Sequence, residues 1–277
     1  MSKINLACGD TFIDANEWIN FDYVSSSPAV RKANLLGHLP LKTGSASLVY
    51  SSHFLEHIPY SEVPGFIAEC YRILQPGGVL RLVLPDFENL CRAYLENREN
   101  GKHREADFII LEIVDQCVRR DSGGELGRFY QTLRGSGTDE DAMIKFVKER
   151  TGEDIQASRQ SHSYAHLSVG TLARKIQNRV EQIWIRLVLH LLPRSFREQN
   201  VSLASVGELH HWLWDYDQLH NVLNAAGFVA IERRDAQTSS FPNFPFIPLD
   251  LDVGGRPRKG AESMYIEAIK PLEEKLP

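Results

Sequence analysis

The sequence predicts a doubly wound α/β fold, and its first 86 residues carry the main evidence. Short apolar segments alternate there with connections, and the same pattern returns near the C-terminus. One predicted strand breaks at Gly9, and the next ends on the carboxylate of Asp22. Because the carboxyl ends of parallel strands meet at one edge of a sheet, these two ends are expected to lie side by side where ligands bind.

Five strands and one helix are expected in this first part. The strands are residues 3–7, 18–21, 30–33, 46–51 and 79–84. A helix over 60–74 repeats apolar residues at helical spacing, and Ser61 is placed to cap it. The sequence Gln75-Pro76-Gly77-Gly78 then ends the helix and turns the chain. Asp86 is placed to cap a further helix that runs through Tyr94.

The strand pattern disappears over residues 88–209, which are richer in charge and helical periodicity. One long helix is expected there over 171–192, ended by Pro193. Asp215 and Gln218 then have the spacing of a helix cap, and Gly227 ends that helix. Two last strands are expected over 228–232 and 263–269, the second an antiparallel partner. The predicted core is therefore 1–87 with 210–277, and 88–209 is a helical insertion.

The composition is that of an ordinary globular protein, with 43% apolar and 24% charged residues. A formal charge of −5 provides no basic surface of the kind that nucleic acids attract. The four cysteines show no C-x-x-C spacing, which disfavours a metal or disulfide framework and favours a cytoplasmic location. We expect neither a secretory signal nor a membrane-spanning segment, since no apolar run approaches 18 residues.

The two strand ends indicate a cofactor that contains a nucleoside. Gly9 has no Cβ, so the backbone there can approach a ligand closely. Asp22 can accept hydrogen bonds from both hydroxyls of a ribose, although a strand-end turn residue is the plainer alternative. Cys8 is expected to be a small buried residue. A nucleophilic role is disfavoured, because no basic group nearby in sequence would lower its pKa.

Several segments taken together resemble the class I S-adenosylmethionine-dependent methyltransferases, and in particular a small-molecule branch found in bacterial polysaccharide gene clusters. The resemblance covers roughly residues 3–86 and 210–270. It rests on the strand end at 5–9, Asp22, Leu39-Pro40-Leu41, the run at 50–57 (Tyr-Ser-Ser-His-Phe-Leu-Glu-His), the turn at 74–78, and the segments at 210–215, 226–228 and 255–259.

The resemblance implies a seven-stranded sheet whose last two strands form a reversed hairpin at one edge. It also implies S-adenosylmethionine as the cofactor. By matching motif positions, Asn5, Ala7, Cys8 and Gly9 would surround its methionine part. Asp22, with Tyr23 after it, would hold the ribose. The remaining cofactor contacts would be Asn34 and Leu35 beside the adenine, and Ser51, Ser52 and His53 near the sulfonium.

The sequence departs from the family pattern at the start. Only residues 10–17 separate Gly9 from Trp18, so the usual first helix is absent or one turn long. Asn5 stands where the broader family often has an acidic residue, and Asn34 where it often has an aspartate. Less of the cofactor would therefore be covered on this side.

Three histidines are candidates for acid–base chemistry. A hydroxyl acceptor must lose its proton during methyl transfer, and the ordinary pKa of histidine suits that task. His53 is the first candidate, because it follows the strand that ends near the methyl group. Glu56 and His57 are better explained as anchors of the next helix start, although His57 is kept as a candidate base. His210, or its neighbour His211, could reach an acceptor from the opposite wall.

Other motifs leave alternatives open. Trp212 and Trp214 could stack on a sugar or belong to the core. His162 and His166 have a spacing that could bind zinc, but nothing around them supports a metal, and none is predicted. The apolar segment 183–192 is expected to be a buried lid helix or dimer interface, with membrane docking as the alternative. The cations at 256–259 could bind a phosphate or carboxylate of the acceptor, or form a charged loop.

The predicted function is O-methylation of a small molecule with S-adenosylmethionine as the methyl donor. A sugar or glycan precursor, which could be lipid-linked, is preferred as the acceptor only through the family resemblance. The insertion at 88–209 would cover the acceptor site, and a homodimer and peripheral contact with the inner membrane face stay open. The rivals are a non-catalytic cofactor-binding protein and a membrane-docking scaffold of the same fold. The negative net charge disfavours an RNA substrate.

Overall fold

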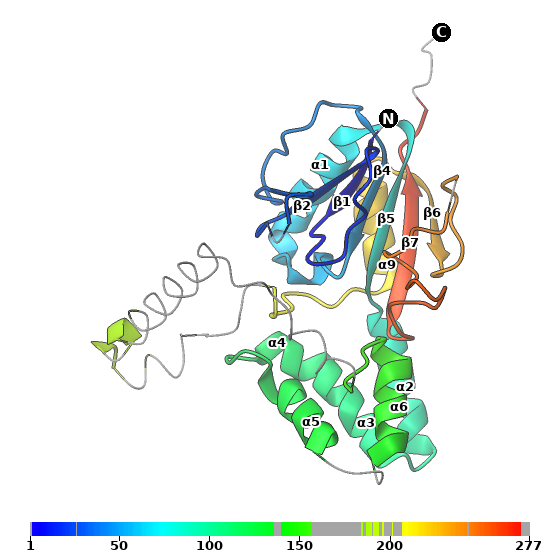
Figure 1. Cartoon of the computed structure of the whole chain (residues 1–277). Helices are drawn as coiled ribbons and strands as arrows, with labels where there is room; N and C mark the ends of the chain where they lie inside the picture. Colours follow the sequence, from blue (N-terminus) through cyan, green and yellow to red (C-terminus); the bar gives the residue numbers. More distant parts are fainter. Residues whose placement is uncertain are drawn as a thin grey trace.

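The computed structural model describes residues 2–25, 27–135, 140–156, 184, 187–189, 191–193, 196, 201, 207–242 and 244–272. Their centre is a seven-stranded sheet, which confirms the predicted α/β class (Figure 1). The strands are β1 (Ser2–Leu6), β2 (Trp18–Asp22), β3 (Val30–Lys32), β4 (Ala46–Ser52), β5 (Leu74–Pro85), β6 (Val229–Arg234) and β7 (Ser263–Ile269).

The strand order is β3-β2-β1-β4-β5-β7-β6. Strands β1 to β5 are parallel, while β7 is antiparallel to both β5 and β6, so the expected reversed hairpin at the edge is confirmed. The chain leaves β1 toward β2 and β3 and returns on its other side as β4. This reversal is the point of a doubly wound sheet where ligands bind, just beyond the carboxyl ends of the strands.

The turn predicted at 75–78 is present as a loop inside β5. Ala46 pairs with Leu74, but Leu48 pairs with Val79, so four residues of β5 bulge out opposite one of β4. Gly77 takes a φ of +75° there, a conformation that favours glycine. Strand β5 therefore begins at Leu74 and not at the predicted residue 79, because β5 pairs with β4 both before and after the bulge.

One face of the sheet is covered by α1 (Val63–Ile73) and α9 (Tyr216–Ala225) (Figure 1). Their apolar residues form the larger core cluster with strand residues such as Ile4 and Leu82. Asp215 caps α9 by accepting a hydrogen bond from the Gln218 N–H at 2.8 Å, as predicted. Ser61 does not cap α1, and that prediction was wrong. A 3₁₀ turn, Tyr60–Glu62, leads directly into the helix, so Glu62 occupies the cap position with no side-chain bond.

The other face is covered by the irregular segment 236–251, whose Phe246 and Leu249 pack on strand residues. A fully buried arginine of β5, Arg81, holds this segment in place. Its guanidinium lies 2.9 Å from Glu267 Oε1 and 3.3 Å from Asp250 Oδ2, and it donates to two carbonyl groups of residues 235–238. Charges buried this deeply require partners, so Arg81 and its two carboxylates form one unit.

A layer of helices lies beyond the carboxyl edge of the sheet (Figure 1). It comprises α2 (Phe87–Glu99), α3 (His103–Ile110), a π-helical turn (Leu111–Asp115), α4 (Gln116–Val118), α5 (Gly124–Gly135) and α6 (Asp141–Thr151). These helices have their own apolar cluster, which includes Phe108 and Val147. Asp86 caps α2 as predicted, but the helix continues past Tyr94. The expected helix over 171–192 falls mostly outside the described residues.

Backbone hydrogen bonds join this helical layer to the sheet. The N–H groups of Ala261 and Glu262, just before β7, donate to the carbonyls of Glu149 and Arg150 at the end of α6. Gly152 makes the close approach possible, since a Cβ there would lie 2.2 Å from the Arg258 carbonyl oxygen. Among the helices described, none is long and apolar enough to cross a membrane.

Candidate active site

The ends of β1, β2 and β4 meet at the ligand-binding edge. Two residues at these ends, Ala7 and His53, have positive φ angles of 55° and 51° although neither is glycine. Such a conformation costs a non-glycine residue about 1–2 kcal/mol and persists where the surroundings impose it, often at functional sites. Gly9, with φ of 53°, follows Ala7 on the same turn.

Asp22 bonds the turn after β1. Its Oδ2 accepts a hydrogen bond from the Gly9 N–H at 2.9 Å, and its Oδ1 accepts one from the Val24 N–H at 3.0 Å. Each carboxylate oxygen has two lone pairs, so both oxygens keep acceptor capacity for a ligand. A Cβ on Gly9 would meet nothing within 4 Å, so the space in front of this turn is open.

A cavity of about 190 Å³ lies at this turn. It is lined by Asn5, Ala7, Cys8, Gly9, Asp10, Thr11, Tyr50, Ser52, Leu249, Arg258 and Lys259. Residues 10–17 contain no helix, as the short spacing predicted. Instead, the Arg258 side chain crosses from the loop before β7 and donates to Thr11 Oγ1 at 2.9 Å. Two cations therefore reach the cavity from a loop more than 200 residues away in sequence.

The structure brings five of the predicted cofactor residues to this cavity: Asn5, Ala7, Cys8, Gly9 and Ser52. The Asn5 amide donates to Thr11 O at 3.2 Å and to Asn20 Oδ1 at 3.3 Å, which shapes the floor. Burial, reinforced by Asp22, raises the pKa of the Cys8 thiol to about 12. Cys8 is thus a protonated thiol at neutral pH.

The other predicted cofactor residues, including Asp22 and His53, are not part of the lining of this cavity. The Ser51 hydroxyl is buried and donates to Leu6 O, and the Leu35 side chain belongs to the core. The side-chain oxygen Oδ1 of Asn34 accepts a hydrogen bond from the Leu36 N–H. Tyr23, after Asp22, is 57% exposed.

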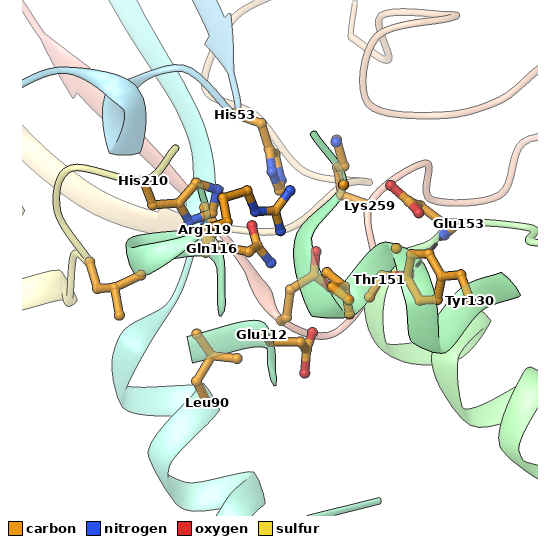
Figure 2. Close-up of a pocket in the computed structure, with 16 residues that line it drawn as sticks. His53, Leu90, Glu112, Gln116, Arg119, Tyr130, Thr151, Glu153, His210 and Lys259 are labelled. Carbon is orange, nitrogen blue, oxygen red and sulfur yellow. Dashed lines mark hydrogen bonds between the residues drawn. The ribbon is translucent and has the colours of Figure 1, made fainter. Parts of the chain in front are cut away.

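A second cavity, of about 260 Å³, lies between the end of β4 and the helical layer (Figure 2). Figure 2 shows His53, His210, Arg119 and Lys259 grouped on one side of it. It is lined by His53, Pro85, Leu90, Glu112, Gln116, Arg119, Gly123, Leu126, Gly127, Tyr130, Thr151, Glu153, His210, Leu213, Lys259 and Glu262. This lining is rich in charged groups of both signs, which suits a polar occupant.

A hydroxyl and a carboxylate flank the two ring nitrogens of His53. Its Nε2 lies 2.9 Å from Ser263 Oγ at the start of β7, and its Nδ1 lies 3.4 Å from Glu56 Oε1. Burial lowers the pKa of His53 well below its ordinary value, and the charge of Lys259 lowers it further. The imidazole is therefore neutral at pH 7 and able to accept a proton.

His57 and His210 also lie together, and the structure places His210 on the wall of the second cavity. Their rings pack edge to face with centroids 4.8 Å apart. His57 Nδ1 lies 3.0 Å from Leu209 O. Burial lowers the pKa of His210 to about 3 and also lowers that of His57. Glu56 is 1% exposed, and burial raises its pKa to about 7.

The expectation that Glu56 anchors a helix start through its side chain was wrong. Within the described residues its carboxylate oxygens have no hydrogen-bond partner. The backbone carbonyl makes the contact instead, accepting from the N–H groups of His211 and Trp212. Trp214 belongs to the core, which was one of the two alternatives for the tryptophans. Trp212 is 39% exposed, and its indole N–H donates a hydrogen bond to Gln218.

Sequence reasoning missed the helical half of the second cavity. Glu112 and Gln116 lie on or next to a π-helical turn, a distortion common at functional sites, and Arg119 follows one turn later. No local pattern marks these residues. Of the cations at 256–259, Arg256 pairs with Asp252 at the surface and Arg258 bonds backbone carbonyls. Only Lys259 lines both cavities. Residues His162 and His166, and most of 183–192, lie outside the described part of the chain.

The comparisons with known proteins agree with this geometry. Residues 15–82 match a family model described as a methyltransferase domain, a stretch that includes Asp22 and His53. No curated protein matches the sequence. The match therefore places a methyltransferase domain on β2 to β5 of the seven-stranded sheet.

Solved structures that resemble the chain include a possible histamine N-methyltransferase from Thermotoga maritima (12% identity, 97% of this chain and 82% of that chain covered, TM-score 0.37). Others are S-adenosylmethionine-dependent methyltransferases from Archaeoglobus fulgidus (10%, 97% and 86%, 0.40) and Methanosarcina mazei (12%, 98% and 93%, 0.39). With TM-scores of 0.40 or less, these structural similarities assign no property of those proteins to this chain.

Proposed function

We propose that the protein transfers the methyl group of S-adenosylmethionine to a hydroxyl oxygen of a small polar acceptor. The main support is the position of two consecutive residues at the end of β4: Ser52 lines the first cavity, and His53 lines the second. Lys259 lines both. A cofactor in the first cavity and an acceptor in the second would therefore meet at this strand end.

The residues of the first cavity fit the cofactor. The open space before Gly9 admits ligand atoms close to the backbone, and Asp22 has the acceptor capacity for ribose hydroxyls. Arg258 and Lys259 bring positive charge for the carboxylate of its methionine part. When bound, S-adenosylmethionine supplies a methyl group on a sulfonium, which is already an activated leaving group. The chain's own task is then to align the acceptor and remove its proton.

We propose that Nε2 of His53 accepts the proton that the acceptor hydroxyl loses during methyl transfer. Nε2 lies 2.9 Å from Ser263 Oγ, and Nδ1 lies 3.4 Å from Glu56 Oε1. In the tautomer that carries its proton on Nδ1, Nε2 has a free lone pair. An acceptor hydroxyl that replaces or joins the Ser263 contact could pass its proton to Nε2. The lowered pKa keeps His53 in the neutral form that this step requires.

The lining of the second cavity supports a polyhydroxylated acceptor, such as a sugar or glycan precursor. Carboxylates from Glu112 and Glu153, the Tyr130 hydroxyl and the Arg119 guanidinium offer both acceptors and donors. Most of these groups come from the helical segment 88–209, so we propose that this segment selects the acceptor and covers it, with 1–87 and 210–277 as the cofactor-binding core.

A two-part experiment tests the proposal. Calorimetric titration with S-adenosylmethionine and with its demethylated product is expected to give binding of both. Transfer of a radiolabelled methyl group is then assayed against a panel of sugars, sugar nucleotides and glycan extracts.

The variant His53→Gln is expected to lower turnover at least 100-fold with little change in cofactor affinity, since general-base catalysis contributes about 10²–10⁴-fold. The matched control is His220→Gln on α9, outside both cavities. Equal turnover in wild type and His53→Gln would remove His53 as the base. Absence of cofactor binding would refute the proposed function itself.

A further inference from the structure

Beside the second cavity, Glu56, His57 and His210 bring three metal-ligating groups together. One carboxylate oxygen and one nitrogen from each ring all lie within 4.8 Å of one another. Glu56 and His57 belong to the 3₁₀ turn after β4, whereas His210 arrives from the segment before α9. Backbone bonds hold the two segments together, since the His211 N–H donates to Glu56 O at 2.7 Å and the His210 N–H to Gln116 O at 2.9 Å.

The cluster contains buried polar atoms that lack partners. Among the described residues, neither carboxylate oxygen of Glu56 nor Nδ1 of His210 has a hydrogen bond, although these residues are 1% and 7% exposed. An unsatisfied buried polar group costs about 1–3 kcal/mol, and more when it is charged. Buried polar groups without a partner are uncommon in folded proteins. A cation bound between Glu56 and the two histidines would give a carboxylate oxygen of Glu56 a partner.

His57 is oriented as metal-binding histidines are. Its Nδ1 lies 3.0 Å from Leu209 O, and a carbonyl can only accept, so the proton resides on Nδ1. Nε2 therefore keeps its lone pair, which lies 3.8 Å from Glu56 Oε1. A backbone carbonyl that holds the second ring nitrogen in this way is the usual outer support of a histidine ligand.

We propose that Glu56, His57 and His210 bind a divalent transition-metal ion of the zinc class. Two imidazoles with one carboxylate suit such an ion, whereas Mg²⁺ and Ca²⁺ prefer all-oxygen ligands. Zinc bonds of about 2.0–2.2 Å place tetrahedral ligand atoms roughly 3.3–3.5 Å apart. The observed separations close to that value if the side chains move inward by about 1 Å.

Three protein ligands leave one coordination position open, as in catalytic zinc sites. His210 lines the second cavity, so the open position faces the acceptor. There the ion would bind the acceptor hydroxyl and lower its pKa, which eases proton transfer to His53. This catalytic role rests on the proposed function; binding of the ion does not.

The neighbouring charges permit a cation. Arg119 lies close enough to lower the pKa of both His57 and His210, but Asp115 pairs with it at 3.0 Å and offsets its charge. Lys259 acts on Glu56 and His57 from the loop before β7. The Glu56 carboxylate would supply the negative charge that compensates the ion most directly.

Calorimetric titration of the chelator-treated protein with ZnCl₂, without cofactor or acceptor, tests the site. We expect one ion per chain and an increase in the thermal midpoint of unfolding on binding. Co²⁺ in place of Zn²⁺ should give the visible absorption of a site with nitrogen ligands and low coordination number.

The variants Glu56→Gln and His210→Ala should each weaken Zn²⁺ binding about 100-fold or more, because loss of a ligand exceeds the 10–100-fold effect of losing its outer support. His211→Ala is the matched control, since the adjacent His211 side chain is exposed and its N–H contact to Glu56 O survives the change. Circular dichroism of each variant confirms that it folds.

The outcomes separate the two proposals. Absence of stoichiometric Zn²⁺ binding to wild type, or binding that both variants retain, would overturn the metal site. Zn²⁺ binding without methyl transfer to any acceptor would instead overturn the proposed function and leave the metal site standing. Methyl transfer that a chelator does not affect would overturn the catalytic role of the ion.

Discussion

The carboxylate of Asp22 offers the sharpest test of the cofactor site, through the variant Asp22→Asn. The substitution preserves the size and shape of the side chain but replaces one acceptor oxygen with an NH₂ group, which only donates. In the wild type both oxygens already accept backbone N–H bonds, from Gly9 at 2.9 Å and from Val24 at 3.0 Å. The amide can satisfy only one of these donors, and it lacks the charge that strengthens a bond to a ribose hydroxyl.

The magnitude follows from these contacts. A hydrogen bond to a charged group contributes about 1.5–3 kcal/mol. The variant loses at least one such bond to the cofactor and weakens the turn that shapes the cavity, so a loss of about 3 kcal/mol in binding free energy is expected. Since 1.4 kcal/mol corresponds to a factor of ten, affinity should fall about 100-fold.

Calorimetry with S-adenosylhomocysteine measures this effect without turnover. Asp14→Asn is the matched control, because it makes the same charge change at an exposed position in the loop after β1. We expect the control to bind like wild type. An affinity within threefold of wild type for Asp22→Asn would show that Asp22 is a turn residue and not a cofactor ligand.

Four further predictions concern other parts of the molecule. Lys259→Met should weaken cofactor binding about 10-fold or more, by loss of a cation from both cavities; calorimetry that shows unchanged affinity would contradict this assignment. Arg81→Met should lower the free energy of unfolding by about 3–5 kcal/mol in urea titrations, because two buried carboxylates lose their partner, and a change below about 1 kcal/mol would disprove their coupling. Gly152→Ala should destabilise the protein by more than about 1 kcal/mol, because φ is +79° and a Cβ would strike a carbonyl oxygen 2.2 Å away; a neutral effect would mean that α6 shifts freely. Burial raises the pKa of Glu262 to about 7, so the folded chain holds a proton that the unfolded chain has released above its ordinary value of 4.5. Stability should thus fall as pH rises from about 5 to 8, and Glu262→Gln should gain relative to wild type by up to about 3 kcal/mol across that window in urea titrations; a constant difference would show that the pKa of Glu262 is not raised.

The predictions that succeeded depend on neighbours in the sequence. The strand at 263–269 has the bounds that its pattern predicted. Asp86 and Asp215 cap α2 and α9, because a cap joins a side chain to N–H groups two or three residues later. The Ser61 prediction was wrong for an instructive reason. A 3₁₀ turn already satisfies the local backbone there, so the helix begins without a side-chain cap.

Other features depend on contacts between distant segments. No pattern in 236–251 shows that it covers a sheet face, because its position follows from the buried charges of Arg81 and Asp250. Lys259 looked like one of three cations in a loop, and only the fold places it between two cavities. The cluster proposed to bind a metal was missed for the same reason, since the whole of the helical segment 88–209 lies between His57 and His210 in the sequence.

By itself, the sequence determined the α/β class, the strand ends that carry Gly9 and Asp22, and the histidine that follows β4. These are properties of short segments, whose apolar spacing and terminal residues act on the backbone within a few positions. The tertiary structure decided which charges face the acceptor, how Glu56 is left without a hydrogen bond, and which histidines surround it. Burial and long-range contact determine those features, and neither is a property of any single segment.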